Sequence, residues 1–135
     1  MIDLLVKEDD SIVIPCAVAK TTHGAIVCDT NAAILQQNYE NLVTEAIEEH
    51  QVFFKLPSFK NVVDLSTEFS VSADRGLDFN PTATRYEKMR KLIKSWTFKD
   101  AEGSELPATP ENIDALHPII ANYLGAELDI QTPSL

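Results

Sequence analysis

The chain has 135 residues and a formal net charge of −10, and 44% of its residues are hydrophobic and 24% charged. This length suits one domain with its own core, and an acidic balance argues against general nucleic-acid binding, which needs broad neutralisation of phosphates. No apolar run approaches the roughly 20 residues that span a bilayer, and the first ten residues lack a signal-peptide pattern. We therefore expect a soluble, cytoplasmic protein with no nucleic-acid or membrane partner.

The charge is unevenly distributed along the chain. Residues 85–99 contain six of the eleven basic residues and one acidic residue, Glu87, so this segment has a net charge of +5 and the remainder −15. Such a segment can meet an acidic surface, either the protein's own or a partner's. The simplest interpretation is a solvated helix face. The basic residues are Arg85, Lys88, Arg90, Lys91, Lys94 and Lys99.

Residues 11–28, SIVIPCAVAKTTHGAIVC, predict two short strands joined by a turn near His23 and Gly24. Pro15 cannot donate a hydrogen bond to a ladder, so the first strand is expected to be an edge strand or to carry a bulge. Cys16 and Cys28 lie in apolar surroundings and are predicted to be reduced core residues. They can form a disulfide only if their strands are neighbours.

Residues 29–50, DTNAAILQQNYENLVTEAIEEH, predict an amphipathic helix with one buried stripe. Asp29, Thr30 or Asn31 can cap its first turn. His50 ends the stripe and is expected to be a satisfied, partly buried histidine rather than a ligand or a base. The stripe comprises Leu35, Tyr39, Leu42, Val43, Ala46, Ile47 and His50.

The middle of the chain predicts a short buried strand over Val52–Leu56. Pro57 ends this strand, and Ser58 can cap a helical turn that carries Phe59, Val62, Val63 and Leu65. Residues 66–80 show no sustained period and are interpreted as a loop, or as a transient strand around Phe69–Val71. Within a single domain of residues 1–135, we place a sub-boundary at 66–80, between an N-terminal α/β half and a C-terminal helical half.

A second amphipathic helix is predicted over residues 83–96, ATRYEKMRKLIKSW, with Thr82 or Thr84 as its N-cap. Its basic residues crowd toward the C-terminal end, where the helix dipole favours cations. The apolar stripe comprises Tyr86, Met89, Leu92, Ile93 and Trp96.

A tight turn follows this helix. Thr97 and Phe98 are β-formers, and residues 100–103 supply turn chemistry in which Gly103 is free to take a positive φ. Trp96 and Phe98 are positioned to be clamped between the helices on either side of the turn. Trp96 is expected to be a core residue, and the alternative is a partner-binding hot spot.

The last helical segment begins at Thr109, which caps it, with Pro110 at the first helical position. Pro118 interrupts the apolar pattern, so we expect either a kink or two short helices that meet at His117. Gly125 weakens the far end, and residues 129–135 are expected to be loose. The predicted fold class is α+β: a small N-terminal hairpin of short strands, amphipathic helices and a C-terminal helix–turn–kinked-helix unit.

No pattern of catalytic chemistry is recognisable. The sequence lacks GxGxxG, P-loop, GxSxG and HExxH motifs. His23 lies between the two cysteines, but a metal site there lacks CxxC spacing and a fourth ligand. A nucleophile and base formed by Cys28 and His50 has no local signature. The carboxylates of Glu45, Glu48 and Glu49 fall on the polar helix face, where the expected state is a solvated charge.

From these observations we predict a protein that is not an enzyme, with no catalytic residues, no cofactor and no metal, and that binds other proteins. The protein-interface candidates are Arg85, Lys88, Lys91, Lys94, Trp96 and Phe98.

Two stretches carry a resemblance to a known family. The first, YEKMRKLIKSWTFKDAEGSELPATPENIDALHPIIANYL, is a basic helix that ends in Lys-Ser-Trp and continues through a Lys-Asp-x-x-Gly turn, a Leu-Pro segment and a Thr-Pro-Glu-Asn-Ile helix start. The second is KLPSFKNVVDL, a Leu-Pro and aromatic segment that leads into a short helix. Over roughly residues 52–128, the chain resembles the tail assembly chaperones of long-tailed phages.

The resemblance implies a non-enzymatic assembly factor in the host cytoplasm that holds the tape-measure protein soluble and helps to recruit tail-tube subunits. A homo-oligomer is compatible with this role. The alternative is a structural virion component, such as a head–tail connector or a minor tail protein. A third hypothesis is a small host-directed regulator or enzyme.

Overall fold

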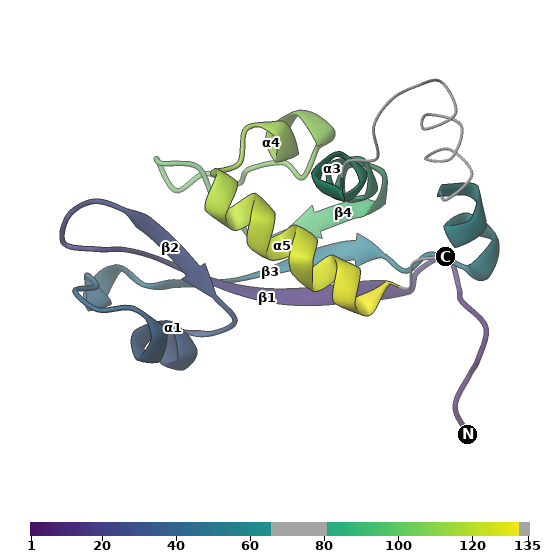
Figure 1. Cartoon of the computed structure of the whole chain (residues 1–135), viewed down its shortest axis with the longest axis horizontal. Coiled ribbons are helices and arrows are strands. Elements are labelled where there is room, and N and C mark those ends of the chain that lie inside the picture. The colour runs from purple at the N-terminus through teal and green to yellow at the C-terminus, as the bar shows by residue number, and fades with distance from the viewer. Residues whose placement is uncertain (66–80, 133–135) are drawn as a thin grey trace.

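The computed structural model describes residues 1–65 and 81–132, apart from the side chains of Pro81 and Thr82. Its centre is a four-stranded antiparallel sheet in the order β2-β1-β3-β4. Figure 1 shows α3, α4 and α5 on one face of this sheet and α1 on the other. The predicted α+β class is confirmed. The strands are β1 Ser11–Lys20, β2 Ile26–Asp29, β3 Glu48–Lys55 and β4 Ile93–Trp96.

The helical elements are short except for α3 and α5. They are α1 Ala32–Asn38, the 3-10 helix η1 Thr44–Ala46, a helix whose described part covers 59–65, α3 Pro81–Leu92, α4 Pro110–Asp114 and α5 Pro118–Gln131.

The predicted N-terminal hairpin is confirmed. β1 and β2 pair in antiparallel register, with Ala19 opposite Val27. The connecting turn contains Gly24 at φ +88, and the N–H of Gly24 donates to the carbonyl of Thr21 at 2.9 Å. A positive φ is accessible to glycine without a steric cost, which is why the turn forms here.

The expectation that Pro15 marks an edge strand or a bulge is wrong, because β1 is an inner strand with a regular ladder to β3. β2 pairs only with Ala17–Lys20, so beside Pro15 that side of β1 carries no ladder. Gln51 lies opposite Pro15, and both of its backbone groups bond to Thr97 on the other side of β3. In an antiparallel pair of this kind the backbone groups of both residues point away from the partner strand, so those of Pro15 point away from β3. The carbonyl of Pro15 accepts a hydrogen bond from the Tyr123 hydroxyl on α5 at 2.6 Å. The proline therefore removes no ladder bond.

The predicted helix over residues 29–50 is correct only at its start. Asn31 caps α1 by accepting from the N–H of Ile34 at 2.9 Å, but α1 ends at Asn38. Asn41 adopts φ +60, a conformation that a helix interior does not contain. Residues 48–50 join β3, because pairing with β1 supplies a complete ladder that the local helical pattern did not reveal.

The second predicted helix also ends early. α3 begins at Pro81, so Thr82 and Thr84 lie inside it rather than at its N-cap, and it ends at Leu92. The next four residues form β4, which pairs with β3 through an irregular register. This irregularity places Ile93 opposite Phe54 and Trp96 opposite Val52. Two residues three positions apart thus share the core face of a strand, a spacing that is typical of a helix.

The turn after β4 is confirmed. Gly103 has φ +82, and its N–H donates to the carbonyl of Asp100 at 3.0 Å. Trp96 is buried, and its indole N–H donates to the carbonyl of Leu106 across the turn. Phe98 is also buried, with its ring centroid 5.2 Å from that of Trp96. Burial of a tryptophan in such a core stabilises the fold by about 3 kcal/mol.

Of the two alternatives predicted at Pro118, a kinked helix or two short helices, the structure shows two helices, α4 and α5. Thr109 caps α4 by accepting from the N–H of Asn112 at 3.2 Å. His117 caps α5, and its Nδ1 accepts from the N–H of Ile119 at 3.3 Å. The expectation of a loose tail is wrong for residues 129–132, because α5 continues to Gln131 and Thr132 is buried; residues 133–135 lie outside the described part of the chain.

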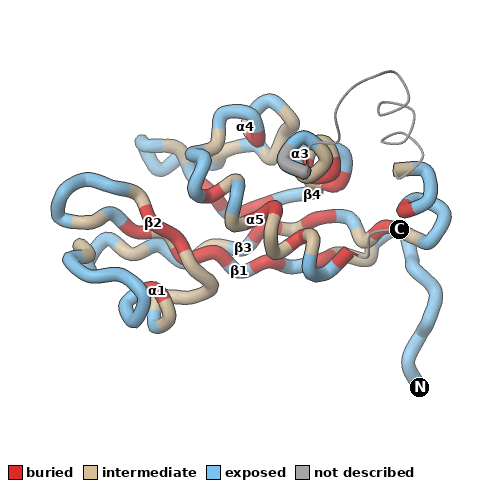
Figure 2. Tube along the Cα trace, viewed as in Figure 1, coloured by how far each residue is buried: buried red, intermediate tan, exposed pale blue. Residues whose placement is uncertain are grey.

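Two hydrophobic clusters stabilise the two faces of the sheet. The larger lies between the sheet and α3, α4 and α5, and the smaller lies between β1, β2 and α1. Figure 2 shows buried residues along the strands and along α5. The smaller cluster comprises Ala17, Ala19, Val27 and Leu35. The predicted sub-boundary at 66–80 falls outside the described residues, but the strands on either side of it, β3 and β4, are paired.

The cysteines are buried free thiols, as predicted. Their strands are neighbours, and Cys28 lies opposite Val18, two positions along β1 from Cys16. The Cys28 thiol donates to the carbonyl of Ile119 at 3.6 Å. A hydrogen bond with the Cys28 thiol and burial together raise the pKa of Cys16. Cys16 is therefore a neutral thiol at physiological pH.

The hydrogen bond from Tyr123 to Pro15 predicts a pH-dependent stability. Burial raises the pKa of Tyr123 to about 12, above the ordinary value of about 10. The stabilisation from the neutral phenol is thus complete below pH 10 and is lost as the pH rises toward 12. In urea unfolding at pH 7, Tyr123→Phe should lower the free energy of unfolding by about 1 kcal/mol. This difference should shrink above pH 10, and a difference that stays constant up to pH 12 would contradict the assignment.

Candidate functional site

The predicted basic surface on α3 mostly bonds to the protein itself. Arg85 Nε and Lys88 Nζ both contact the carboxylate of Asp129 on α5, at 2.9 and 3.1 Å. Lys88 is buried in this position. Gly125 permits the approach, because a Cβ there would lie 2.2 Å from Cδ of Arg85. Gly125 therefore has a packing role in α5, in addition to its low helix propensity.

The remaining basic residues reach other elements. Arg90 pairs with Asp114 on α4 and lies over the ring of Tyr86, with its guanidinium carbon 5.4 Å from the centroid. The hydrogen bond from Arg90 lowers the pKa of Asp114. Lys94 donates to the carbonyl of Asp9 at 3.1 Å and to the hydroxyl of Ser11, at the start of β1, at 2.8 Å. Of the two acidic surfaces that the sequence left open, Arg85, Lys88 and Arg90 contact the protein's own.

The six interface candidates do not form one exposed surface. Trp96 and Phe98 lie in the core, and Arg85 and Lys88 face α5. Lys94 lies across the start of β1. Lys91 is exposed and lines a groove beside helix 59–65. Lys91 thus combines a predicted interface residue with a concave surface among residues 1–65 and 81–132.

The contact of Arg85 and Lys88 with one carboxylate predicts the effect of removing its charge. Asp129→Asn leaves the buried Lys88 without an anionic partner and should lower the free energy of unfolding by about 1–2 kcal/mol. Asp114→Asn is the matched control, because its partner Arg90 is more accessible and exposed pairs contribute little. Urea unfolding at pH 7 measures both variants. Equal stability of Asp129→Asn and wild type would show that the contact does not hold α3 to α5.

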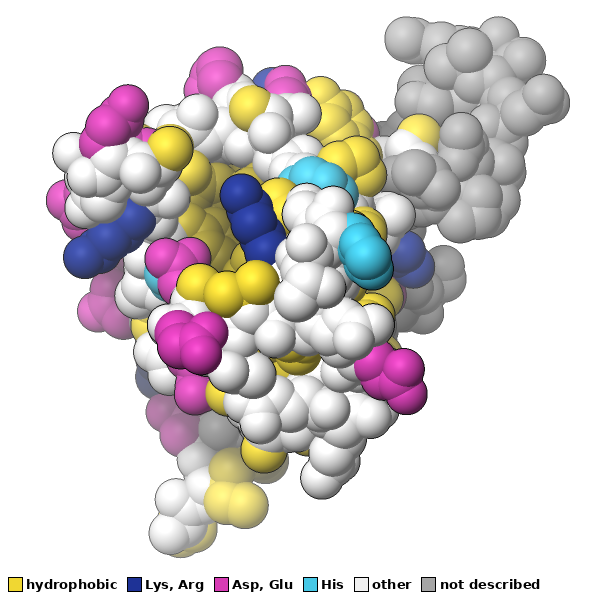
Figure 3. Space-filling model, turned by 90° about the vertical axis from the view of Figure 1, so that its left-hand side faces the viewer, with side chains coloured by type: hydrophobic (Ala, Val, Ile, Leu, Met, Phe, Trp, Pro, Cys, Tyr) yellow, Lys and Arg dark blue, Asp and Glu magenta, His cyan; other side chains and the backbone are white. Residues whose placement is uncertain are grey.

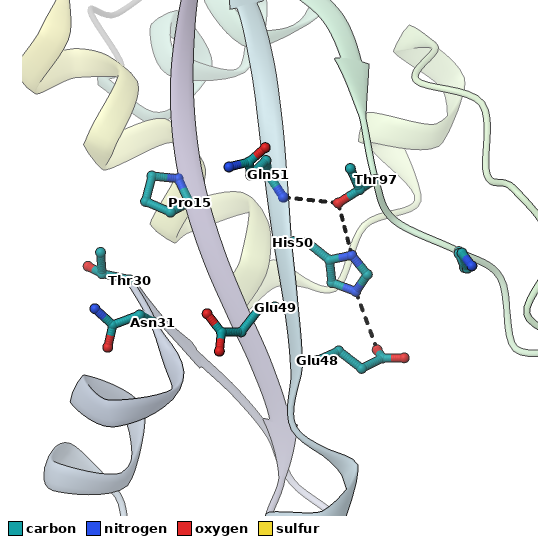
Figure 4. A pocket seen from close by; sticks show the side chains of 9 residues that line it. Pro15, Thr30, Asn31, Glu48, Glu49, His50, Gln51 and Thr97 are labelled. Carbon is teal, nitrogen blue, oxygen red and sulfur yellow. Dashed lines mark hydrogen bonds and ion pairs between the residues drawn. The ribbon is translucent and has the colours of Figure 1, made fainter.

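One concave region lies at the end of the sheet near His50. It is an open hollow of about 620 Å³, and Figure 4 shows the arrangement of the side chains around it. The lining residues come from β1, β3, the start of α1 and the chain after β4: Pro15, Thr30, Asn31, Glu48, Glu49, His50, Gln51, Thr97 and Lys99.

His50 is the centre of a short polar chain in this hollow (Figure 4). Its Nδ1 lies 3.1 Å from the hydroxyl oxygen of Thr97, and its Nε2 lies 3.5 Å from a carboxylate oxygen of Glu48. The ring also packs edge-on against Phe98, with centroids 5.1 Å apart. His50 is therefore a partly buried histidine with satisfied nitrogens, as the sequence predicted, although it lies on a strand and not on a helix.

The Thr97–His50–Glu48 chain contains the groups of a nucleophile, a base and an orienting acid. The Thr97 hydroxyl, however, also accepts the backbone N–H of Gln51 at 3.0 Å, and the Thr97 N–H donates to the Gln51 carbonyl. The Glu48 side chain is mostly exposed and its contact with His50 is long. The bonds to Thr97 connect β3 with the residue after β4, so these contacts have a structural role.

A second concave region is a groove between helix 59–65 and α3, with a volume of about 260 Å³. Its apolar lining residues Pro57 and Leu92 are buried, and Leu56 and Leu65 are half-buried. Its polar lining residues are exposed and form the rim: Lys55, Asn61, Asp64 and Lys91. The groove thus has an apolar floor and a charged rim.

Phe59 lies on the helix that forms one wall of the groove. The N–H of Asn61 donates to the Ser58 hydroxyl at 3.3 Å, which confirms the predicted cap. Val62 is buried and anchors the helix, but 77% of Phe59 is exposed. The sequence indicated Phe59 and Val62 as parts of one apolar turn. It did not reveal the groove, because α3 is distant in the sequence.

Figure 3 shows the end of the molecule where the β1–β2 turn and the 98–106 turn lie. Acidic, basic and histidine side chains surround hydrophobic ones on this face.

The comparisons with known proteins give no relative: no family model matches the chain, and no curated protein or solved structure is significantly similar to it. Within residues 1–65 and 81–132, no helix has the length and apolar character needed to cross a membrane. The same residues contain no group of three or more His, Cys, Asp or Glu side chains placed to hold a metal ion.

Proposed function

We propose that this protein is a non-enzymatic, chaperone-like assembly factor of a phage tail that binds tape-measure and tail-tube proteins in the host cytoplasm. The observation that carries the proposal is the groove between helix 59–65 and α3. Phe59 lies exposed on the same helix but does not line the groove. One groove wall is formed by KLPSFKNVVDL, one of the two stretches that resemble the tail assembly chaperones.

The groove suits a helical partner segment. An amphipathic helix places its apolar face into an apolar groove and its polar face toward solvent. Leu56 and Leu92 supply the apolar floor, and Lys55 and Lys91 line the rim. A partner helix whose flanks are acidic would complement these cations, and a tape-measure protein that is mostly helical offers many such segments.

Phe59 is a second expected contact, on the face of helix 59–65 that points away from the groove. A few aromatic residues commonly contribute most of the binding energy of an interface. Phe59 is exposed in the free protein, so a partner that covers it removes a large apolar side chain from water. Burial of such a side chain is worth about 1.5–3 kcal/mol, or roughly a 10- to 150-fold change in affinity.

The proposal predicts that Phe59→Ala weakens binding to a co-expressed tape-measure fragment at least tenfold without changing the thermal midpoint. The matched control is Ile130→Ala, because Ile130 is also 77% exposed but lies near the end of α5. The affinities are measured by titration calorimetry. Equal affinities of both variants and wild type would exclude Phe59 as a contact of the partner.

Mass spectrometry of purified particles separates this function from the alternative of a structural virion component. An assembly factor should be absent from mature particles and present with tail proteins in infected cells. A stoichiometric amount in the particle would favour a connector or minor tail protein.

A further inference from the structure

The two cysteines lie next to each other on the face of the sheet that α5 covers. Cys28 on β2 is opposite Val18 on β1. Because side chains on a strand alternate between the two faces, Cys16 projects from the same face as Val18 and Cys28. Cys16 and Cys28 are thus diagonal neighbours on adjacent strands, a relation in which side chains reach each other. Both are buried and belong to the larger hydrophobic cluster.

Hydrogen bonds join the two thiols to each other and to α5. The Cys16 thiol is bonded to the Cys28 thiol, and the Cys28 thiol donates to the carbonyl of Ile119, in the first turn of α5, at 3.6 Å. The bond from Cys16 lowers the pKa of Cys28, whereas the same bond and burial raise the pKa of Cys16. Cys28 is therefore the first of the two to become a thiolate, and the neutral thiol of Cys16 lies against it.

The first half of α5 covers the two sulfurs. Besides the contact of Ile119 with Cys28, the Tyr123 hydroxyl donates to the carbonyl of Pro15, the residue before Cys16, at 2.6 Å. We therefore expect a reagent to reach the thiols when this part of α5 opens locally, a motion smaller than global unfolding. A small, uncharged oxidant requires the smallest opening, and hydrogen peroxide is such an oxidant.

We infer that Cys16 and Cys28 form a reversible disulfide within one chain when the protein meets a peroxide. The hydrogen bond between the thiols already places the two sulfurs in contact, so rotation of the two side chains is the main movement that an S–S bond requires. Disulfides in reducing compartments are commonly transient and redox-sensing. This inference is independent of the groove and of the proposed function.

The reaction proceeds in two balanced steps. The Cys28 thiolate attacks one oxygen of the peroxide, the O–O bond breaks, and Cys28 becomes a sulfenic acid. The hydroxide that leaves takes up the proton that Cys28 released, which gives water. The sulfur of Cys16 then attacks that of Cys28, the S–S bond forms, and the S–O bond breaks with loss of a second water. Overall, the two thiols lose two hydrogens and two electrons, and the peroxide is reduced to water.

The disulfide changes the stability of the fold as well as its chemistry. Cys28 no longer carries the proton that it donates to Ile119, so the first turn of α5 loses one contact with β2. At the same time, β1 and β2 become covalently joined, and a cross-link that restricts the unfolded chain stabilises the folded state. The thermal midpoint of the oxidised monomer should therefore exceed that of the reduced protein, by roughly 5–10 °C.

Peptide mapping of the full chain after treatment with hydrogen peroxide tests the inference. Trypsin cuts after Lys20, between the two cysteines, and peptides 8–20 and 21–55 contain no methionine, which peroxide also oxidises. After alkylation of the remaining thiols, the two peptides of the monomer should be recovered as one linked species. Dithiothreitol, which reduces disulfides but not methionine sulfoxide, should separate the peptides and return the thermal midpoint to its lower value. Cys16→Ala and Cys28→Ala are matched controls, since neither can form the link.

Three results would overturn the inference. The first is a folded protein whose two cysteines both stay reduced in excess peroxide. The second is a gain of oxygen atoms on the cysteine peptides with no link between them, and the third is a link found only in covalent dimers. A disulfide that lowers the thermal midpoint would also contradict the inference, because it would show that the two sulfurs do not meet within the intact fold.

Discussion

The pairing of β3 with β4 is the constraint on which the rest of the structure depends. In this pairing Val52 lies opposite Trp96. Two further hydrogen bonds continue it by one residue: the Gln51 N–H donates to the Thr97 hydroxyl, and the Thr97 N–H donates to the Gln51 carbonyl. β3 leads into helix 59–65, and α3 leads into β4. The pairing therefore places these two helices beside each other and creates the groove. The same pairing brings Thr97 to His50.

The basic segment stabilises this arrangement from within the molecule. Arg85 and Lys88 connect α3 to α5 through Asp129, and Arg90 connects α3 to α4 through Asp114. Two of the protein's own carboxylates, Asp114 and Asp129, thus offset part of the +5 charge of residues 85–99. The features that stay available for partners are mainly apolar: the groove between helix 59–65 and α3, and the exposed Phe59.

Local signals predicted the parts of the fold that local interactions determine. The caps at Asn31, Ser58 and Thr109, the β1–β2 turn and the break at Pro118 each rest on residues close in sequence. The helices assigned to residues 29–50 and 83–96 failed at their C-terminal ends, where strand pairing with distant residues competes with helix propensity. The sequence correctly predicted that Trp96 is a core residue, but it placed Trp96 on a helix instead of on β4. The irregular register of β4 puts Ile93 and Trp96 on the same face, and this three-residue spacing is the one that a helix would show. The groove was unpredictable, since its walls meet only through the β3–β4 ladder.

Native-state hydrogen exchange tests this dependence most directly. If the β3–β4 pairing is integral to the fold, the Thr97 amide, which donates to the Gln51 carbonyl, should exchange only by global unfolding. Its free energy of opening should then equal that of the amides in the β1–β3 ladder and should rise and fall with them as urea is added. A Thr97 amide that opens several kcal/mol more easily, with no urea dependence, would contradict the account.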